Sequence, residues 1–154
     1  MKVCLMQHAR AVDLEDGSDR VVSEAGRVAT KQVARFVAEH LDVNVSRIYH
    51  SGKTRARQTA ELFAQEAAPT AELEAVDGLA PMDDPAIWTQ RICDMHTDVM
   101  LVGHLPHMDR LTSILVTGDA GAGVVAVRNS GLMCLEAVED GWRLCWMLIP
   151  GVLR

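Results

Sequence analysis

The sequence predicts an α/β fold: a three-layer sandwich with a mixed, mainly parallel central sheet and helices on both faces. Two continuous apolar runs, residues 3–6 and 99–102, are typical of strands buried on both faces, as in parallel sheets. Segments with helical spacing alternate with strand-like segments, which is the pattern of α/β proteins. Near the carboxyl end, Asp140-Gly141 separates two strand-like segments and predicts an antiparallel hairpin at one side of the sheet.

Local signals predict the other elements in order. Ser23-Glu24 can cap a helix whose apolar residues keep helical spacing as far as Leu41. Ser51-Gly52 ends a short strand, and Pro69 ends the helix that follows it. The strands that we predict besides the two apolar runs are residues 47–50, 73–76, 124–128, 132–138 and 142–149. The helices after the first are residues 53–66, 86–95 and the segment after Pro106, and the loops are 13–20, 81–85 and 117–123.

Composition limits the classes of protein. A chain of 154 residues, 49% apolar and 23% charged, fits a single globular domain over residues 1–154. Its apolar runs are far shorter than the roughly 20 residues of a membrane span. The apolar stretch at its N-terminus is too short for a signal peptide. The net charge of −6 argues against a nucleic-acid binder. We therefore expect a cytoplasmic protein without membrane or nucleic-acid partners.

The four cysteines do not suggest metal or disulfide chemistry. None lies in a C-x-x-C pair, and none lies next to a histidine at zinc-finger spacing. Disulfides are rare in the cytosol, whereas free cysteine is often fully buried. We expect all four to be small buried hydrophobic residues: Cys4, Cys93, Cys134 and Cys145.

Three strand ends carry side chains suited to an anionic substrate. His8 follows the first apolar run, and His104 follows the run at 99–102. The polar segment from Ser51 to Arg55 follows a strand and opens a helix, where free backbone N–H groups attract anions. Because ligands of open α/β sheets bind at the carboxyl ends of the strands, we expect these residues to form one pocket. The guanidinium of Arg55 suits phosphate.

Four segments carry a family resemblance. They are LMQHARA at 5–11, DRVVSEAGR at 19–27, SGKTRARQTA at 51–60 and LVGHLP at 101–106. In this order they resemble the R-H-G and three further motifs of the histidine phosphatase superfamily. The short chain looks most like the SixA-type phosphohistidine phosphatases. The resemblance implies a phosphoglycerate mutase-like fold.

The resemblance also implies the roles of three residues. His8 would be the nucleophile that takes the phosphoryl group, Arg55 would clamp the phosphate, and His104 would donate a hydrogen bond to the phosphoryl oxygens. A neutral imidazole, with an ordinary pKa of about 6.5, is a usable nucleophile near neutral pH. A covalent phosphohistidine splits the reaction into two easier steps. This scheme needs no metal and no cofactor, and its product is inorganic phosphate.

Two positions depart from the motif, because Gln7 replaces its arginine and Ala9 its glycine. Glutamine carries no charge, so another cation would have to contribute. Arg10 is our first candidate, ahead of Arg20 and Lys53. Our candidates for substrate binding are therefore Gln7, Arg10, Arg20, Ser51 and Lys53. Gln7 leaves two interpretations open: an active variant, or a non-catalytic phosphate- or phosphoprotein-binding module.

The leaving group bears on the substrate. Larger members of the superfamily use a carboxylate acid, for which Asp83 and Asp84 are the candidates here. Phosphohistidine has a weak P–N bond and needs less acid help, so its cleavage on a signalling or phosphotransfer protein is the function that we expect. One alternative is a phosphatase for small phosphate esters. Another is a metal-dependent hydrolase with a site at His50, His104 and His107.

Overall fold

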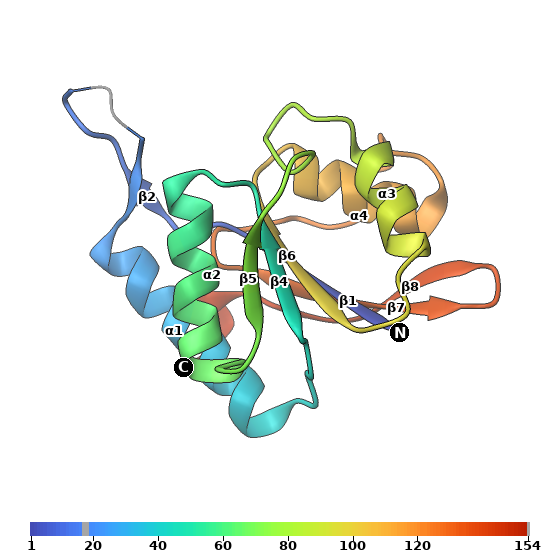
Figure 1. Ribbon diagram of the computed structural model, residues 1–154, viewed down its shortest axis with the longest axis horizontal. Coiled ribbons are helices and arrows are strands. Elements are labelled where there is room, and N and C mark those ends of the chain that lie inside the picture. The colour runs from blue at the N-terminus through green and yellow to red at the C-terminus, as the bar shows by residue number, and fades with distance from the viewer. Residues whose placement is uncertain (17–18, 154) are drawn as a thin grey trace.

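The computed structural model describes residues 1–16 and 19–153, and its centre is a six-stranded sheet of order β5-β4-β6-β1-β7-β8 (Figure 1). The first four strands in this order run parallel, whereas β7 and β8 are antiparallel. The prediction of a mixed, mainly parallel sheet is therefore confirmed. The strands are β1 (Lys2–Gln7), β4 (Arg47–His50), β5 (Glu72–Ala75), β6 (Val99–Gly103), β7 (Leu132–Val138) and β8 (Gly141–Leu148).

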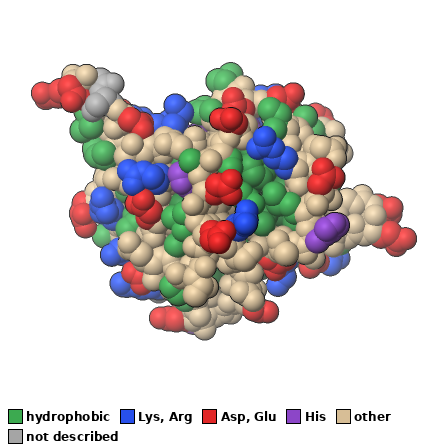
Figure 2. Space-filling view, in the orientation of Figure 1, with side chains coloured by type: hydrophobic (Ala, Val, Ile, Leu, Met, Phe, Trp, Pro, Cys, Tyr) green, Lys and Arg blue, Asp and Glu red, His purple; other side chains and the backbone are tan. Residues whose placement is uncertain are grey.

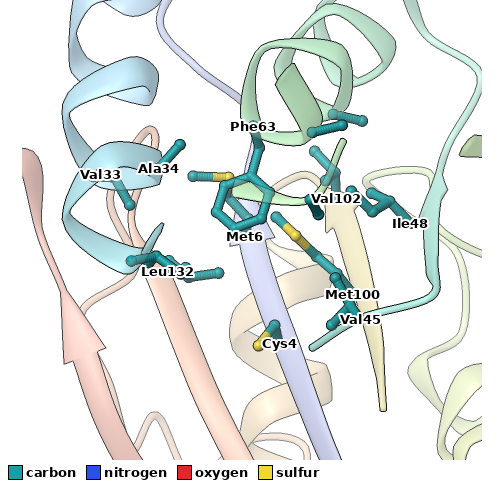
Figure 3. Close-up of a cluster of buried hydrophobic side chains, with 14 of the residues drawn as sticks. Cys4, Met6, Val33, Ala34, Val45, Ile48, Phe63, Met100, Val102 and Leu132 are labelled. Atoms are coloured by element: carbon teal, nitrogen blue, oxygen red, sulfur yellow. The ribbon is translucent and has the colours of Figure 1, made fainter. Parts of the chain in front are cut away.

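Helices cover both faces of this sheet, as predicted (Figure 1). Side chains alternate along β1: Cys4 and Met6 belong to the core cluster that includes residues of α1 and α2, which Figure 3 shows. Val3 and Leu5 belong to the cluster on the opposite face, with residues of α3 and α4. This double coverage is why β1 reads as one continuous apolar run. The helices are α1 (Glu24–His40), α2 (Thr54–Ala67), α3 (Pro85–Cys93) and α4 (His107–Thr117).

The capping signals act as predicted at the start of α1. The Ser23 hydroxyl accepts a hydrogen bond from the backbone N–H of Gly26 at 3.0 Å, which satisfies one free donor of the first turn. Gly26 also lets the chain after β1 approach α1 closely, because a Cβ there would lie 2.4 Å from the carbonyl oxygen of Arg10. The first turn of α1 is thereby packed directly against the backbone of Arg10.

The strand predicted at residues 124–128 is wrong. This segment is irregular and ends in a turn at Arg128–Gly131, in which Ser130 has a left-handed backbone with φ of 57°. The apolar run suggested a strand, but β7 already pairs with β1 on one edge and with β8 on the other. No edge of β7 remains free for a further strand. The hairpin signal at Asp140-Gly141 is confirmed by the β7–β8 pair.

A second, two-stranded sheet was not predicted. Strands β2 (Ala11–Val12) and β3 (Val21–Val22) pair antiparallel and extend away from the main sheet (Figure 1). They are too short to give an alternating pattern in the sequence. Residues 17 and 18 of the predicted loop at 13–20 lie outside the described residues. A short 3-10 helix, η1 (Pro150–Val152), follows β8.

The prediction for the cysteines is half right. Cys4 and Cys134 are buried, but Cys93 and Cys145 are exposed, and all four are free thiols. Cys145 lies on the edge strand β8, where alternate side chains point to solvent, and Cys93 is the last residue of α3.

The face of the molecule shown in Figure 2 carries an apolar patch. Figure 2 shows hydrophobic side chains gathered between β5 and α3, bordered by acidic and basic ones. Within the described part of the chain, no helix is long and apolar enough to cross a membrane.

Candidate active site

Two histidines meet at the carboxyl ends of β1 and β6. These strands are parallel neighbours, and Gln7 pairs with Gly103, so the next residue of each strand is His8 and His104. The backbone N–H of His8 donates to the carbonyl of Gly103 at 2.9 Å. The two rings lie 4.9 Å apart between centroids, and both side chains are buried. The predicted convergence of these two histidines is present in the structure.

The hydrogen bonds of His8 indicate which ring nitrogen carries the hydrogen and which carries the lone pair. Nδ1 lies 2.7 Å from the carbonyl oxygen of Ala9, which can only accept, so Nδ1 carries the hydrogen. Nε2 then holds the lone pair, and Arg55 donates to it from Nε at 3.4 Å. The nucleophilic lone pair of a neutral His8 is therefore on Nε2, beside a guanidinium.

Arg55 is held close to His8 by the first turns of α2. The Thr59 hydroxyl donates to the Arg55 carbonyl at 2.7 Å and accepts from the backbone N–H of Ala9 at 2.8 Å. One buried threonine thus joins α2 to the residue after His8. Asp19 completes the arrangement: it accepts from the backbone N–H of Thr54 at 2.6 Å and lies 3.5 Å from Nη1 of Arg55.

Asp19 is a residue of the site that was not predicted from the sequence. The hydrogen bond from Thr54 and the charge of Arg55 lower the pKa of its carboxyl, so it is ionised at neutral pH. Its position directly before Arg20 in the motif at 19–27 was the available signal. It orients Arg55 without neutralising it fully, because the separation is long for an ion pair.

Ser51 joins the site from the end of β4. Its hydroxyl lies 2.6 Å from Nε2 of His104, and either atom can be the donor. Nδ1 of His104 is buried and has no hydrogen-bond partner among the described residues. Ser51 and His104 can therefore present a hydrogen-bond donor to a bound oxyanion, as the sequence analysis expects of His104.

Both histidines are held in the neutral form. Burial, together with the charges of Arg55 and Arg20, lowers the pKa of His8 to about 4, against the opposing effect of the Ala9 carbonyl. Burial lowers the pKa of His104 to about 3, with contributions from His8, Arg55 and Lys53. A site with neutral imidazoles among cations suits an anionic ligand and leaves the His8 lone pair available.

We expect this burial to make folding stability depend on pH. In the unfolded chain His8 takes up a proton near its ordinary pKa of about 6.5, but in the folded chain only near 4. The unfolded state therefore binds more protons between these values, and the free energy of unfolding falls as the pH drops from 6.5 to 4. A shift of this size corresponds to about 3 kcal/mol.

Denaturant titrations across this range test the prediction. The His8→Asn variant should show a shallower dependence than the wild type, because it lacks one of the histidines whose pKa is lowered by burial. Equal pH dependence in both proteins would contradict the neutral burial of His8.

The three candidate cations, Arg10, Arg20 and Lys53, differ in whether they act on the site. The charge of Arg20 lowers the pKa of both His8 and Arg55, and that of Lys53 lowers the pKa of His104, so both cations act on the site. Arg20 Nε is buried without a partner among the described residues, although Nη1 contacts Asp13 at 3.3 Å. Arg10, our first candidate, instead lines a separate cavity beside α1 and η1. The structure does not bring Arg10 together with the other site residues.

Gln7 and the two candidate acids, Asp83 and Asp84, are the remaining residues predicted for the site. Gln7 is buried, and its Oε1 has no partner within the described range. Asp83 accepts from the backbone N–H of Ala80 at 2.8 Å, and Asp84 caps α3 by accepting from Ala86. Both carboxylates thus have local structural partners, and neither forms a hydrogen bond with His8 or His104.

The histidines suggested for an alternative metal site have separate contacts. His50 Nδ1 accepts from the backbone N–H of Gly52 at 3.1 Å, which fixes the turn before α2. His107 is fully buried at the start of α4, with no partner on either ring nitrogen among residues 1–16 and 19–153. Over the same residues, no group of three or more His, Cys, Asp or Glu side chains has the spacing of a metal site.

A buried, neutral histidine with its lone pair on Nε2, a neighbouring arginine and a second histidine at the carboxyl ends of parallel strands form an arrangement suited to phosphoryl transfer. The family model for the histidine phosphatase superfamily (branch 1) matches residues 4–84. This chain belongs to the histidine phosphatase superfamily, and its class is that of phosphatases.

Solved structures agree with this assignment. The protein histidine phosphatase SixA, complexed with tungstate, is 22% identical over the whole of both chains, with a TM-score of 0.87. A protein from Agrobacterium tumefaciens assigned as a phosphohistidine phosphatase SixA is 26% identical over 97% of each chain, with a TM-score of 0.81. The alpha-ribazole phosphatase from Shigella flexneri is 12% identical over 94% of each chain, with a TM-score of 0.75. These likenesses confirm the phosphoglycerate mutase-like fold. A search of curated proteins gave no significant match.

Proposed function

We propose that this protein is a metal-independent phosphohistidine phosphatase that works through a phosphohistidine on His8. The observation that carries the proposal is the neutral His8 ring, whose Nε2 lone pair lies 3.4 Å from Nε of Arg55 and beside the His104 ring. The substrate is a phosphorylated histidine of a signalling or phosphotransfer protein.

The reaction takes two steps. Nε2 of His8 attacks the phosphorus, the P–N bond of the substrate breaks, and the leaving imidazole takes up a proton. Water then attacks the phosphoryl group on His8, which releases inorganic phosphate and restores the free ring. Arg55, Arg20 and the Ser51–His104 pair stabilise the negative charge of the phosphoryl oxygens in both steps.

The environment of the two acids supports phosphohistidine over alkyl phosphates. An alkoxide leaving group needs a proton donor, but Asp83 and Asp84 are engaged in the turn before α3 and in its cap. An imidazole leaving group needs less help. The likeness to SixA proteins points in the same direction.

Hydrolysis of free and protein-bound phosphohistidine, measured with and without EDTA, tests the proposal. We expect turnover of both substrates that EDTA leaves unchanged, and slower turnover of small phosphate esters in the same panel. Loss of activity with EDTA would favour the metal-dependent alternative. Faster cleavage of the esters would favour the phosphomonoesterase.

The Asp83→Asn/Asp84→Asn variant tests the role of the acids. Asparagine can still cap α3, so we expect the fold to persist. We expect phosphohistidine hydrolysis to stay within about twofold, and any alkyl phosphate hydrolysis to fall more. Equal losses on both substrates in a kcat/KM comparison would contradict the idea that phosphohistidine needs no carboxylate acid.

Arg20 is the cation that we propose in place of the motif arginine. We expect Arg20→Ala to lower kcat/KM for free phosphohistidine ten- to a hundredfold, the cost of about 1.5–3 kcal/mol for one charged contact. Arg35→Ala, which removes an exposed arginine paired with Glu66, is the matched control and should leave the rate unchanged. Similar rates in both variants would remove Arg20 from the site.

The second candidate function, suggested by Gln7, is a module that binds phosphate or phosphoproteins without turnover. The uncharged side chain of Gln7 favours it, because the motif has a charged arginine at this position. Tight vanadate binding by a folded wild-type protein that hydrolyses no phosphohistidine would support the binding module.

A further inference from the structure

A cavity lies beside the candidate active site. Its volume is about 330 Å³, and it shares none of its lining residues with the group of His8, Ser51, Arg55 and His104. Two arginines, Arg10 and Arg128, line it together with small and apolar residues. Its other lining residues are Gly26, Ala29, Asn129, Ser130, Ile149, Pro150 and Gly151.

The sheet topology puts this cavity at the same edge as His8. Met6 pairs with Leu132, and Leu132 pairs with Leu148, so the end of β1, the start of β7 and the end of β8 lie side by side. The catalytic group lies on the β6–β4 side of β1, and the cavity lies on its β7–β8 side. Two strand spacings separate β1 from β8, which is about 10 Å.

The lining of the cavity suits a carboxylate. Arg10 and Arg128 are exposed, and neither forms an ion pair with an acidic residue in the part of the chain that the structure describes. No acidic side chain lines the cavity, on a protein whose net charge is −6. Ile149 and Pro150 offer an apolar wall for the aliphatic part of a ligand. Arginine binds carboxylates with two parallel hydrogen bonds.

The cavity wall is joined firmly to the nucleophile strand. The Asn129 side chain donates from Nδ2 to the His8 carbonyl at 2.9 Å, and the Ser130 backbone N–H donates to the Gln7 carbonyl at 3.2 Å. The Ser130 hydroxyl is buried and lies 2.8 Å from that of Thr30, which holds the left-handed residue in place. These contacts set a constant separation between the cavity and His8.

We propose that this cavity binds an acidic side chain of the phosphoprotein substrate, close in space to its phosphohistidine. The inference rests on the proposed function, because it assigns the cavity to the same substrate. The phosphoryl group would occupy the site at His8, while Arg10 and Arg128 would hold a carboxylate in the neighbouring cavity. Arg10 would then serve recognition of the partner rather than the charge of the transferred phosphoryl group.

Binding of two peptides tests this assignment. Both carry a non-hydrolysable phosphonate-triazole analogue of phosphohistidine, and they differ in having glutamate or glutamine at the flanking positions. We expect the wild type to bind the glutamate peptide about tenfold more tightly, the effect of one charge-assisted contact. We expect Arg10→Gln/Arg128→Gln to bind the two peptides equally. The control Arg35→Gln/Arg47→Gln makes the same change in net charge at exposed, distant positions and should keep the preference.

The outcomes of the peptide-binding experiment separate the inference about the cavity from the proposed function. Equal binding of the two peptides by the wild type, or a preference that survives Arg10→Gln/Arg128→Gln, would overturn the inference while phosphohistidine hydrolysis still supports the proposed function. A preference lost in the control pair as well would overturn it, because net charge alone would then explain the result. If the wild type neither hydrolyses phosphohistidine nor binds the glutamine peptide, the proposed function itself fails.

Discussion

Replacing His8 with alanine is expected to abolish phosphohistidine hydrolysis, lowering kcat/KM by at least about 10⁴-fold, as loss of a nucleophile does in other covalent enzymes. The neutral ring of His8 has its lone pair on Nε2, and the guanidinium of Arg55, 3.4 Å from that nitrogen, would bind the phosphoryl group transferred there. Nε2 of His104 lies 2.6 Å from the Ser51 hydroxyl and its Nδ1 is buried, so we do not expect His104 to take over this role. Steady-state kinetics on free phosphohistidine measure the effect.

Two controls accompany the His8→Ala measurement. Circular dichroism and vanadate binding should show that the variant is folded and still binds an oxyanion at Arg55. His40→Ala, at an exposed histidine at the end of α1, should keep wild-type activity. Residual turnover above about a tenth of the wild-type rate in His8→Ala would show that another residue is the nucleophile.

The second largest effect is expected for Arg55→Ala, about 10³-fold in kcat/KM, the scale of a lost transition-state cation or oxyanion donor. Arg55 is largely buried, with a side chain that is 14% exposed, so its charge is poorly screened. Its Nε and Nη1 contact His8 and Asp19, and a phosphoryl group on His8 would lie against the same guanidinium. Lysine at this position should recover only part of the loss, because it lacks the planar fork.

Arg57→Ala is the matched control for Arg55. It removes the same side chain two residues further along α2, where Arg57 pairs with Glu61 at 2.7 Å on the surface. We expect it to change kcat/KM by less than about twofold. If Arg55→Ala and Arg57→Ala behave alike, Arg55 is not the phosphate clamp.

Much of the fold follows from local patterns. The two buried strands at the centre of the sheet are continuous apolar runs, and the helices that flank them have caps or helical spacing in the sequence. The strand predicted at 124–128 fails for a non-local reason. Whether an apolar run becomes a strand depends on a free sheet edge, and β1 and β8 occupy both edges of β7.

The part of the candidate site that is positioned by strand ends and helix starts could be predicted from the sequence. His8, His104 and Arg55 follow strand ends or open a helix, so topology alone brings them together. The contribution of Arg20 rather than Arg10 could not be read from the sequence. Arg10 is nearer to His8 along the chain, but the chain turns after Ala9, where its N–H binds Thr59, and Arg10 faces another cavity. Asp19 depends on a contact with α2, thirty-five residues away in sequence.

Trapping the phosphoenzyme tests the central claim most directly. The wild type is mixed with phosphohistidine, quenched within milliseconds at alkaline pH, where phosphohistidine survives, and digested for mass spectrometry. We predict a phosphoryl group on Nε2 of His8, which forms and decays at rates that match turnover and is absent from His8→Ala. Turnover without a phosphoenzyme, or a phosphoryl group on another residue, would contradict the account.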